Sequence, residues 1–213
     1  MAELVIPSLF ETLYMVFFST VFSLVIGFPL GILLVITEKE SIWEKPQINK
    51  ILSSIINVMR SVPFIILMIL AFPLAKLIVG TKIGTTATIV PLSIAAAPFV
   101  ARVMEGSLKE IDKGVIESSL AMGATVREIV FKVLIPESLP SIVSGVTLTI
   151  INIIGYSAMA GAIGGGGLGD LAIRFGLYKS QKDVMFITLI VIIILVQGVQ
   201  FLGNYISLKI NKK

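Results

Sequence analysis

The side chains that most often carry out chemistry in proteins are missing from this sequence. Its 213 residues include no cysteine and no histidine. This excludes thiol nucleophiles, disulfides, the usual zinc sites, iron–sulfur clusters and acid–base catalysis by imidazole. Few catalytic options remain, so the sequence favours a function other than that of an enzyme.

A glycine-rich segment at 161–169 invites comparison with a phosphate-binding loop. Such a loop needs a lysine directly after its last glycine, and the chain has no Gly-Lys dipeptide. The segment also follows a long apolar stretch that reads as a membrane helix, whereas a P-loop follows a strand. We therefore expect a flexible helix end and an external loop here, with small residues that let helices approach closely.

The composition indicates that any functional residues are positioned by membrane-spanning helices. The chain is 56% hydrophobic and 14% charged, with a mean hydropathy of +1.01, whereas a soluble domain is about a quarter charged. A β-barrel would show alternating segments of roughly ten residues, but the apolar runs here are long and continuous. The sequence predicts an all-α integral membrane protein, with one transmembrane domain over 1–213.

Five long stretches of the chain contain no Asp, Glu, Lys or Arg. From them we predict transmembrane helices at approximately 12–37, 60–79, 83–102, 138–163 and 184–208. In the second helix we expect Arg60 at one membrane interface and Lys76 extending to the other. A charge near the middle of the bilayer would cost roughly 2.5–3.5 kcal/mol.

The distribution of basic residues predicts the orientation. Five spans place the termini on opposite faces, and of the 17 Lys and Arg residues one face holds only Lys76, Lys82, Arg174, Lys179 and Lys182. The more basic face is cytoplasmic, so we expect the N-terminus outside and the C-terminus in the cytoplasm of a multi-pass protein of the cell membrane. This asymmetry also explains the net charge of +4 without a nucleic-acid partner.

The longest cytoplasmic connection is predicted at 102–137, and it reads as a helix–turn–helix. Apolar residues recur at helical spacing in two patterns, first Ile111, Val115, Ile116 and Leu120, then Val126, Ile129, Val130 and Val133. Gly123 lies between them and can supply a helix end with positive φ.

This connection contains a motif with a known counterpart. It reads Glu117-Ser118-Ser119-Leu120-Ala121-Met122-Gly123, followed after nine residues by Val133-Leu134-Ile135-Pro136. The spacing is similar to that of the EAA motif of ABC-importer permeases, in which E-A-A, three residues, G and nine residues precede I-x-L-P. Glu117, Gly123 and Pro136 match outright, and two serines replace the alanines.

The resemblance extends along nearly the whole chain. Residues 155–161 (Gly-Tyr-Ser-Ala-Met-Ala-Gly) and 164–171 (Gly-Gly-Gly-Gly-Leu-Gly-Asp-Leu), together with 57–64 and 96–102, resemble the methionine-importer permease (MetI) family. The resemblance implies a type I ABC-importer permease fold with five spans. It also implies a homodimer in the bilayer with two ATPase subunits, which bind ATP and Mg, and an external methionine-binding lipoprotein.

The same resemblance assigns roles to particular residues. It places the coupling to the ATPase on Glu117, Ser118, Ser119, Ala121, Gly123 and Pro136, and it implies no cofactor in this chain. The alternative for this segment is an amphipathic interfacial helix without a partner. Tyr156, Ser157 and Met159 are candidates for facing the translocation pathway, and packing between helices is the alternative for them.

Three function classes compete. The leading one is a permease subunit of an ATP-binding-cassette importer for methionine, both L and D, with another small amino acid or a methionine derivative as alternative substrates. An ion-coupled secondary carrier would usually keep ionisable residues inside the bilayer, and the five uncharged stretches show none. A membrane enzyme is disfavoured because His, Cys and clustered carboxylates are missing.

Overall fold

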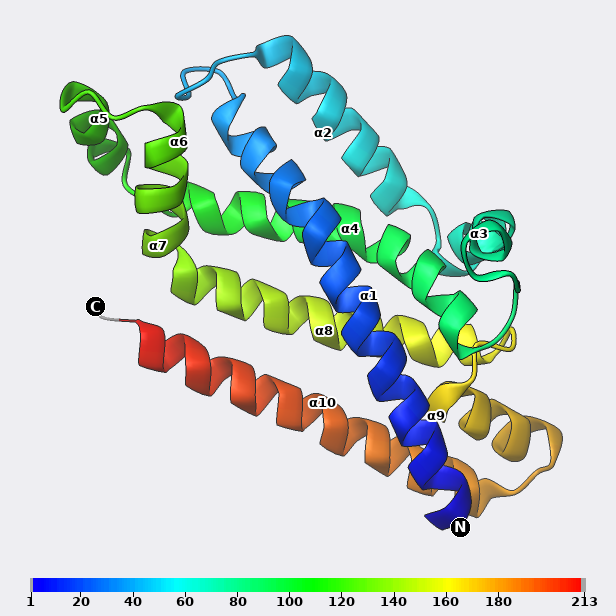
Figure 1. Ribbon diagram of the computed structural model, residues 1–213. Coiled ribbons are helices and arrows are strands. Elements are labelled where there is room, and N and C mark those ends of the chain that lie inside the picture. The colour runs from blue at the N-terminus through cyan, green and yellow to red at the C-terminus, as the bar shows by residue number, and fades with distance from the viewer. Residues whose placement is uncertain (1, 212–213) are drawn as a thin grey trace.

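The computed structural model describes residues 2–211, and every regular element in them is a helix. Four helices are long and apolar enough to cross a membrane: α1 (Ala2–Ile36), α4 (Thr85–Lys109), α8 (Leu139–Gly161) and α10 (Lys182–Ile210). In Figure 1, α4, α8 and α10 run roughly alongside one another and α1 crosses them obliquely, with the N-terminus and the C-terminus at opposite ends of the bundle. Lys212 and Lys213, which the charge distribution assigns to the cytoplasmic face, lie outside the described residues.

Helix α4 forms the centre of the bundle. It packs against both α1 and α8. In its apolar 18-residue stretch 67% of the residues are buried, compared with 11% in that of α10. Gly27 of α1 lies against the carbonyl of Ala97, where a side chain would not fit. The absence of a side chain at Gly27 therefore lets α1 and α4 pack closely, and α10 leaves most of its apolar surface for lipid.

The second predicted span differs in the structure. Residues 60–79 do not form one helix, because α2 (Pro46–Ser61) ends before α3 (Phe64–Val79) begins, and the two are bent by 106°. Pro63 explains the break, since a proline disfavours the helical conformation of the residue before it and Val62 is extended with ψ of 125°. The pair counts as one broken span or as a re-entrant loop.

Arg60 lies at the end of α2 that adjoins this break. It belongs to the last turn of α2, and helical rise places it roughly 21 Å from Pro46, at about 1.5 Å per residue. The N–H of Lys45, next to Pro46, donates to the carbonyl of Thr37 just after α1 at 3.1 Å, and the ion pair between Glu38 and Lys109 at 2.9 Å brings the end of α4 to the same place. Arg60 therefore lies far along the bundle from that end, and its side chain is exposed.

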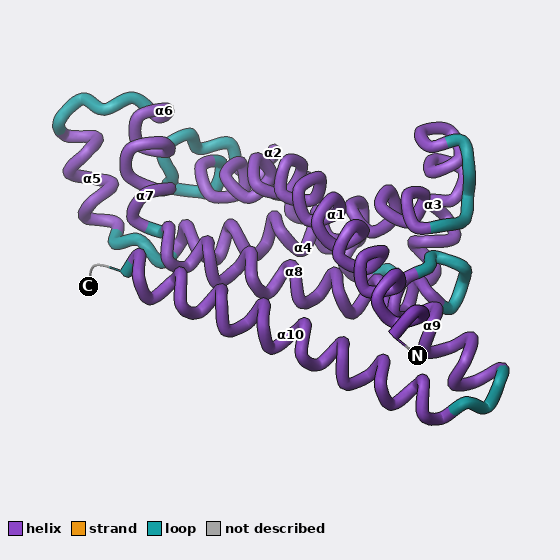
Figure 2. The backbone as a smooth tube through the Cα atoms, turned by 60° about the horizontal axis from the view of Figure 1, so that its bottom comes forward, coloured by secondary structure: helices purple, strands orange, loops and turns teal. Residues whose placement is uncertain are grey.

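Short helices connect α4 to α8. Helix α4 runs to Lys109, beyond its predicted end at 102, and is followed by α5 (Lys113–Ala121), α6 (Val126–Glu128), the π-helix η1 (Ile129–Leu134) and α7 (Ile135–Glu137). Figure 2 shows α5, α6 and α7 grouped at the end of the bundle where the chain terminates. The predicted loop 102–137 is thus a helical projection.

The glycine-rich segment is packed, in contrast to the flexible loop that the sequence suggested. It contains α9 (Gly167–Leu171), which continues into the π-helix η2 (Ala172–Tyr178), and most of α9 is buried. The backbone N–H of Gly167 donates to the carboxylate of Glu11 at 2.7 Å, and that of Leu168 donates to Thr12 Oγ1 at 2.9 Å. These bonds join the segment to the N-terminal part of α1.

Candidate functional site

Helix α5 is a short helix with defined ends. Asp112 caps its start by accepting the backbone N–H of Gly114 at 2.6 Å. At its end Gly123 has φ of +84°, and its N–H donates to the carbonyl of Leu120 at 2.9 Å. Glycine adopts this left-handed conformation without steric cost, so the predicted bend at Gly123 is confirmed.

The turn after Gly123 is closed by a capping box. The side chain of Thr125 accepts the N–H of Glu128 at 3.3 Å, and the Glu128 carboxylate accepts the N–H of Thr125 at 3.1 Å. Lys132 also donates to Glu128 at 2.9 Å. The hydrogen bond from Lys132, followed by those from Thr125, lowers the pKa of Glu128 from 4.5 to about 2.

The structure brings five of the six predicted coupling residues together on α5 and its C-terminal turn. Glu117, Ser118, Ala121 and Gly123 are exposed, whereas Ser119 is buried and its hydroxyl donates to the carbonyl of Val115. The exposed set forms a face of the projection that also includes apolar side chains, since Leu120 is 45% and Met122 is 81% exposed. A short rigid helix with this mixed face is suited to contact another protein.

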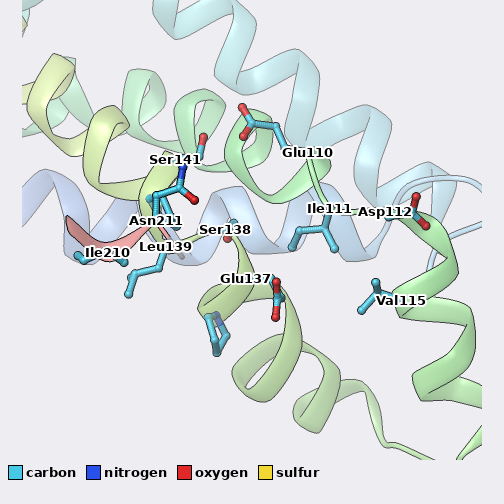
Figure 3. Close-up of a pocket in the computed structure, with 12 residues that line it drawn as sticks. Glu110, Ile111, Asp112, Val115, Glu137, Ser138, Leu139, Ser141, Ile210 and Asn211 are labelled. Carbon is cyan, nitrogen blue, oxygen red and sulfur yellow. The ribbon is translucent and has the colours of Figure 1, made fainter. Parts of the chain in front are cut away.

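Pro136, the sixth residue, lies apart from that face. It is in α7, on the wall of a cavity of about 620 Å³. Figure 3 shows that this cavity joins three parts of the chain: the link from α4 to α5, the start of α8, and the end of α10. Pro136 therefore belongs to the base of the projection.

A second cavity adjoins the bend itself. It measures about 360 Å³ and lies between Ser119, the turn at Met122–Ala124, and the side chains of Glu128 and Lys132. Within residues 2–211 no three of the metal-binding residue types His, Cys, Asp and Glu are grouped so as to hold a metal ion. The exposed face of α5 offers a carboxylate, a hydroxyl and apolar side chains, which are suited to contact with another protein.

The three candidate pathway residues have different surroundings. The ring of Tyr156 stacks on that of Phe64 with centroids 4.5 Å apart, and it lines a cavity of about 260 Å³. Ser157 is buried and its hydroxyl donates to the carbonyl of Ile154, while Met159 is 48% exposed and lines none of the three cavities described.

Two polar residues on the wall of that cavity were not among the candidate site residues predicted from the sequence. They are Arg60 of α2 and Asn152 of α8. The available signal was the charge in Arg60-Ser61-Val62-Pro63, where a proline interrupts an apolar stretch. Asn152 gave no signal, because a single asparagine in a membrane helix is more often a packing residue.

Several permease proteins are similar to this chain over nearly its whole length. The probable D-methionine transport system permease protein MetI of Pasteurella multocida is 50% identical over 205 residues, which cover 96% of this chain and 94% of that protein. The methionine import system permease protein MetP of Bacillus subtilis is 46% identical, over 96% and 92% of the two chains.

Solved structures of ABC transporter chains are also similar to this chain. A chain of the MetNI methionine ABC transporter in an inward-facing conformation superposes with a TM-score of 0.98 at 45% identity, covering 100% of this chain and 98% of that one. A chain of an amino acid ABC transporter, solved with histidines, is 20% identical with a TM-score of 0.79 over 98% and 94% of the chains. The second likeness supports the fold alone.

A family model also matches. It describes the inner membrane component of binding-protein-dependent transport systems, and the match covers residues 27–209. That range includes the α5 projection with Glu117 and Gly123, as well as the broken span and the cavity beside it. The chain therefore belongs to the family of binding-protein-dependent transport system inner membrane components.

Proposed function

We propose that this chain is the permease subunit of an ATP-binding-cassette importer that carries methionine, in its L and D forms, across the cell membrane. Family membership supports the assignment as an importer subunit. Relatives at 46–50% identity that are named for methionine support methionine as the substrate. Another small amino acid or a methionine derivative is the alternative cargo.

The observation that carries the proposal is the α5 projection. A permease of this kind needs a rigid element through which movement of an ATPase subunit reaches the membrane helices. Helix α5 follows α4, the central helix of the bundle, after only three residues, and Gly123 turns the chain back toward η1. In the proposed role Glu117, Ser118, Ser119, Ala121 and Gly123 form the docking element, and Pro136 supports its base.

The proposal includes an assembly and an orientation. Two copies of this chain pair with two ATPase subunits, which hold ATP and Mg, and an external methionine-binding lipoprotein delivers the substrate. The N-terminus is outside, and the α5 projection faces the cytoplasm, in line with the distribution of Lys and Arg. The chain itself has no Gly-Lys dipeptide and so no P-loop, which leaves hydrolysis to the partners.

Reconstitution in proteoliposomes tests the proposal. The purified chain alone should show no ATP hydrolysis, and hydrolysis should appear when the ATPase subunit is added. Uptake of radiolabelled L-methionine and D-methionine should require the ATPase subunit, ATP and the binding protein. ATP turnover by the chain alone, or methionine uptake without ATP, would contradict the proposed function.

A further inference from the structure

The break between α2 and α3 borders a cavity at mid-height of the bundle. The cavity measures about 260 Å³, and the residues that line it come from α2, α3, α4 and α8. Its α4 residues, Ala95 and Phe99, are near the middle of Thr85–Lys109, and its α8 residue Asn152 is near the middle of Leu139–Gly161. The cavity therefore lies close to the midplane of the predicted bilayer, where a broken helix is tolerated only against protein or an aqueous space.

Three polar side chains of the cavity have no partner within the described chain. The guanidinium of Arg60, the amide of Asn152 and the hydroxyl of Tyr156 all line the cavity. None of the three side chains takes part in a hydrogen bond or ion pair among residues 2–211.

A second arginine, Arg102, lies between α2 and α4 and, unlike Arg60, has partners within the chain. Arg102 of α4 pairs with Glu105 at 2.6 Å and donates to Asn57 of α2 at 2.8 Å. Its charge is thus neutralised inside the protein, as expected for a charge in a membrane bundle. Arg60, on the same α2 helix, has no such carboxylate among residues 2–211, so its charge remains available to a ligand.

The rest of the wall is apolar. Met59, Leu67 and Phe99 line it, and Phe64 lies under the ring of Tyr156. The Phe64 and Tyr156 rings are parallel within 2°, which fixes the position of the tyrosine hydroxyl. The cavity therefore offers one cationic group, one amide and one hydroxyl, next to a hydrophobic surface.

We propose that this cavity is a binding site for the amino acid in transit, and that it recognises an apolar amino acid in its zwitterionic form. The guanidinium of Arg60 binds the α-carboxylate, the geometry that arginine suits best. The amide oxygen of Asn152 accepts a hydrogen bond from the α-ammonium, and the Tyr156 hydroxyl donates to the carboxylate. Met59, Leu67 and Phe99 contact the hydrocarbon side chain. This inference rests on the proposed function and adds to it a site within the membrane.

A site of this kind should bind weakly, because transport requires release. The cavity is small, and Arg60 is exposed, so water competes for its hydrogen bonds. A hydrogen bond to a charged group still contributes enough to change affinity by about tenfold. That difference is large enough to measure.

The absence of cysteine makes a site-specific test available. In the complete transporter with its ATPase subunits, Ala95→Cys places one thiol on the cavity wall of each copy of this chain, and a small thiol reagent reports its accessibility. L-methionine should protect this thiol, whereas L-methioninamide, which lacks the carboxylate, should protect it only at about tenfold higher concentration. Adding Arg60→Gln should raise the half-protecting concentration of L-methionine about tenfold and abolish the preference over the amide.

A matched control removes a charge from the same helix without touching the cavity. Lys50→Gln lies three turns earlier on α2, is exposed, and should leave protection unchanged. Asn152→Leu, which keeps Arg60, should weaken protection by L-methionine but not by N-acetyl-L-methionine, whose ammonium is blocked.

The outcomes separate the two proposals. Protection that is absent, or that is equal with Arg60 and with Arg60→Gln, overturns the cavity as a substrate site, provided that the wild-type transporter imports methionine. Failure of the wild-type transporter to import methionine in the same preparation overturns the proposed function, and the zwitterion site with it.

Discussion

At Gly123 the backbone conformation, and not the space around it, requires glycine. Its φ is +84°, and a Cβ there would meet no atom within 4 Å. Gly123→Val should therefore cost about 1–3 kcal/mol through strain alone, tilt or fray α5, and sharply reduce uptake. Co-purification of the ATPase subunit, membrane abundance and uptake should be measured on one preparation.

Asparagine provides the matched control at this position. It adopts positive φ more readily than valine, so Gly123→Asn should retain more coupling than Gly123→Val. Normal uptake by Gly123→Val with the ATPase bound would show that α5 is not the coupling element. Loss of the variant from the membrane would show instead that the glycine is needed for folding.

Glu128 provides a prediction about pH. Its pKa is lowered to about 2 in the folded chain, chiefly by the hydrogen bond from Lys132, so its carboxylate stabilises the capping box above pH 4.5. This contribution should be lost as the pH falls from 4.5 toward 2. A carboxyl NMR titration should show the low midpoint, and Lys132→Gln should raise it.

The neighbouring arginine serves as the control for this titration. Arg127→Gln removes an exposed charge that makes no hydrogen bond to Glu128 among the bonds of the described chain, so it should move the midpoint far less than Lys132→Gln. Equal effects of the two variants would mean that general charge, and not the hydrogen bond, lowers the pKa.

Single residues differed in how much the sequence could predict about them. Gly123 was predictable because a glycine between two helical patterns is a local signal. Arg60 was not, since hydrophobicity alone favours placing a charge at a membrane interface, and its position depends on where Pro63 ends the helix. The contact between Glu11 and Gly167 was also beyond prediction, because no local pattern records which distant residues meet.

The packing of α10 on α8 depends on another glycine. A Cβ at Gly203 would overlap the side chain of Thr147, one turn from the hydrogen bond between Ser144 and Ser207 at 3.0 Å. Gly203→Ala should therefore force the helices apart at a cost of about 1–3 kcal/mol. We expect a lower melting temperature of the detergent-solubilised transporter.

The same helix supplies the control. At Gly198 a Cβ would meet nothing within 4 Å, and alanine is the better helix former, so Gly198→Ala should leave the melting temperature unchanged or raise it slightly. If both substitutions destabilise the protein equally, the close approach at Gly203 is not what holds α10 in place.

At the scale of elements, the bounds of α8 and α10 were predicted closely, whereas α1 begins at Ala2, before its predicted start at 12, α4 runs beyond 102, and the interruptions were not predicted. Helix α8 runs from Leu139 to Gly161 and α10 from Lys182 to Ile210, close to the predicted 138–163 and 184–208. Their apolar composition is sufficient to define them. The break at Val62-Pro63 depends on the local effect of a proline and the packing of α9 on tertiary contacts, and hydropathy records neither.

For the whole molecule, the predicted orientation can be tested by labelling. Thr81→Cys and Tyr178→Cys, both exposed, should react with a membrane-impermeant thiol reagent in intact cells, or in spheroplasts if an outer membrane is present. Lys39→Cys, exposed in the turn after α1, should react only after permeabilisation. The reverse pattern would overturn the assignment of the N-terminus to the outside.

The bonds that join Glu11 and Thr12 to Gly167 and Leu168 have a consequence for how the protein is made. The partners are 156 residues apart, so the ribosome synthesises α1 long before the groups that complete its N-terminal end. A nascent chain that has not yet reached residue 167 lacks these donors, and its Glu11 carboxylate must stay in water or bind other groups. The N-terminal end of α1 therefore acquires these contacts only after residue 168 has been made, and the resistance of this end to protease should arise late in synthesis.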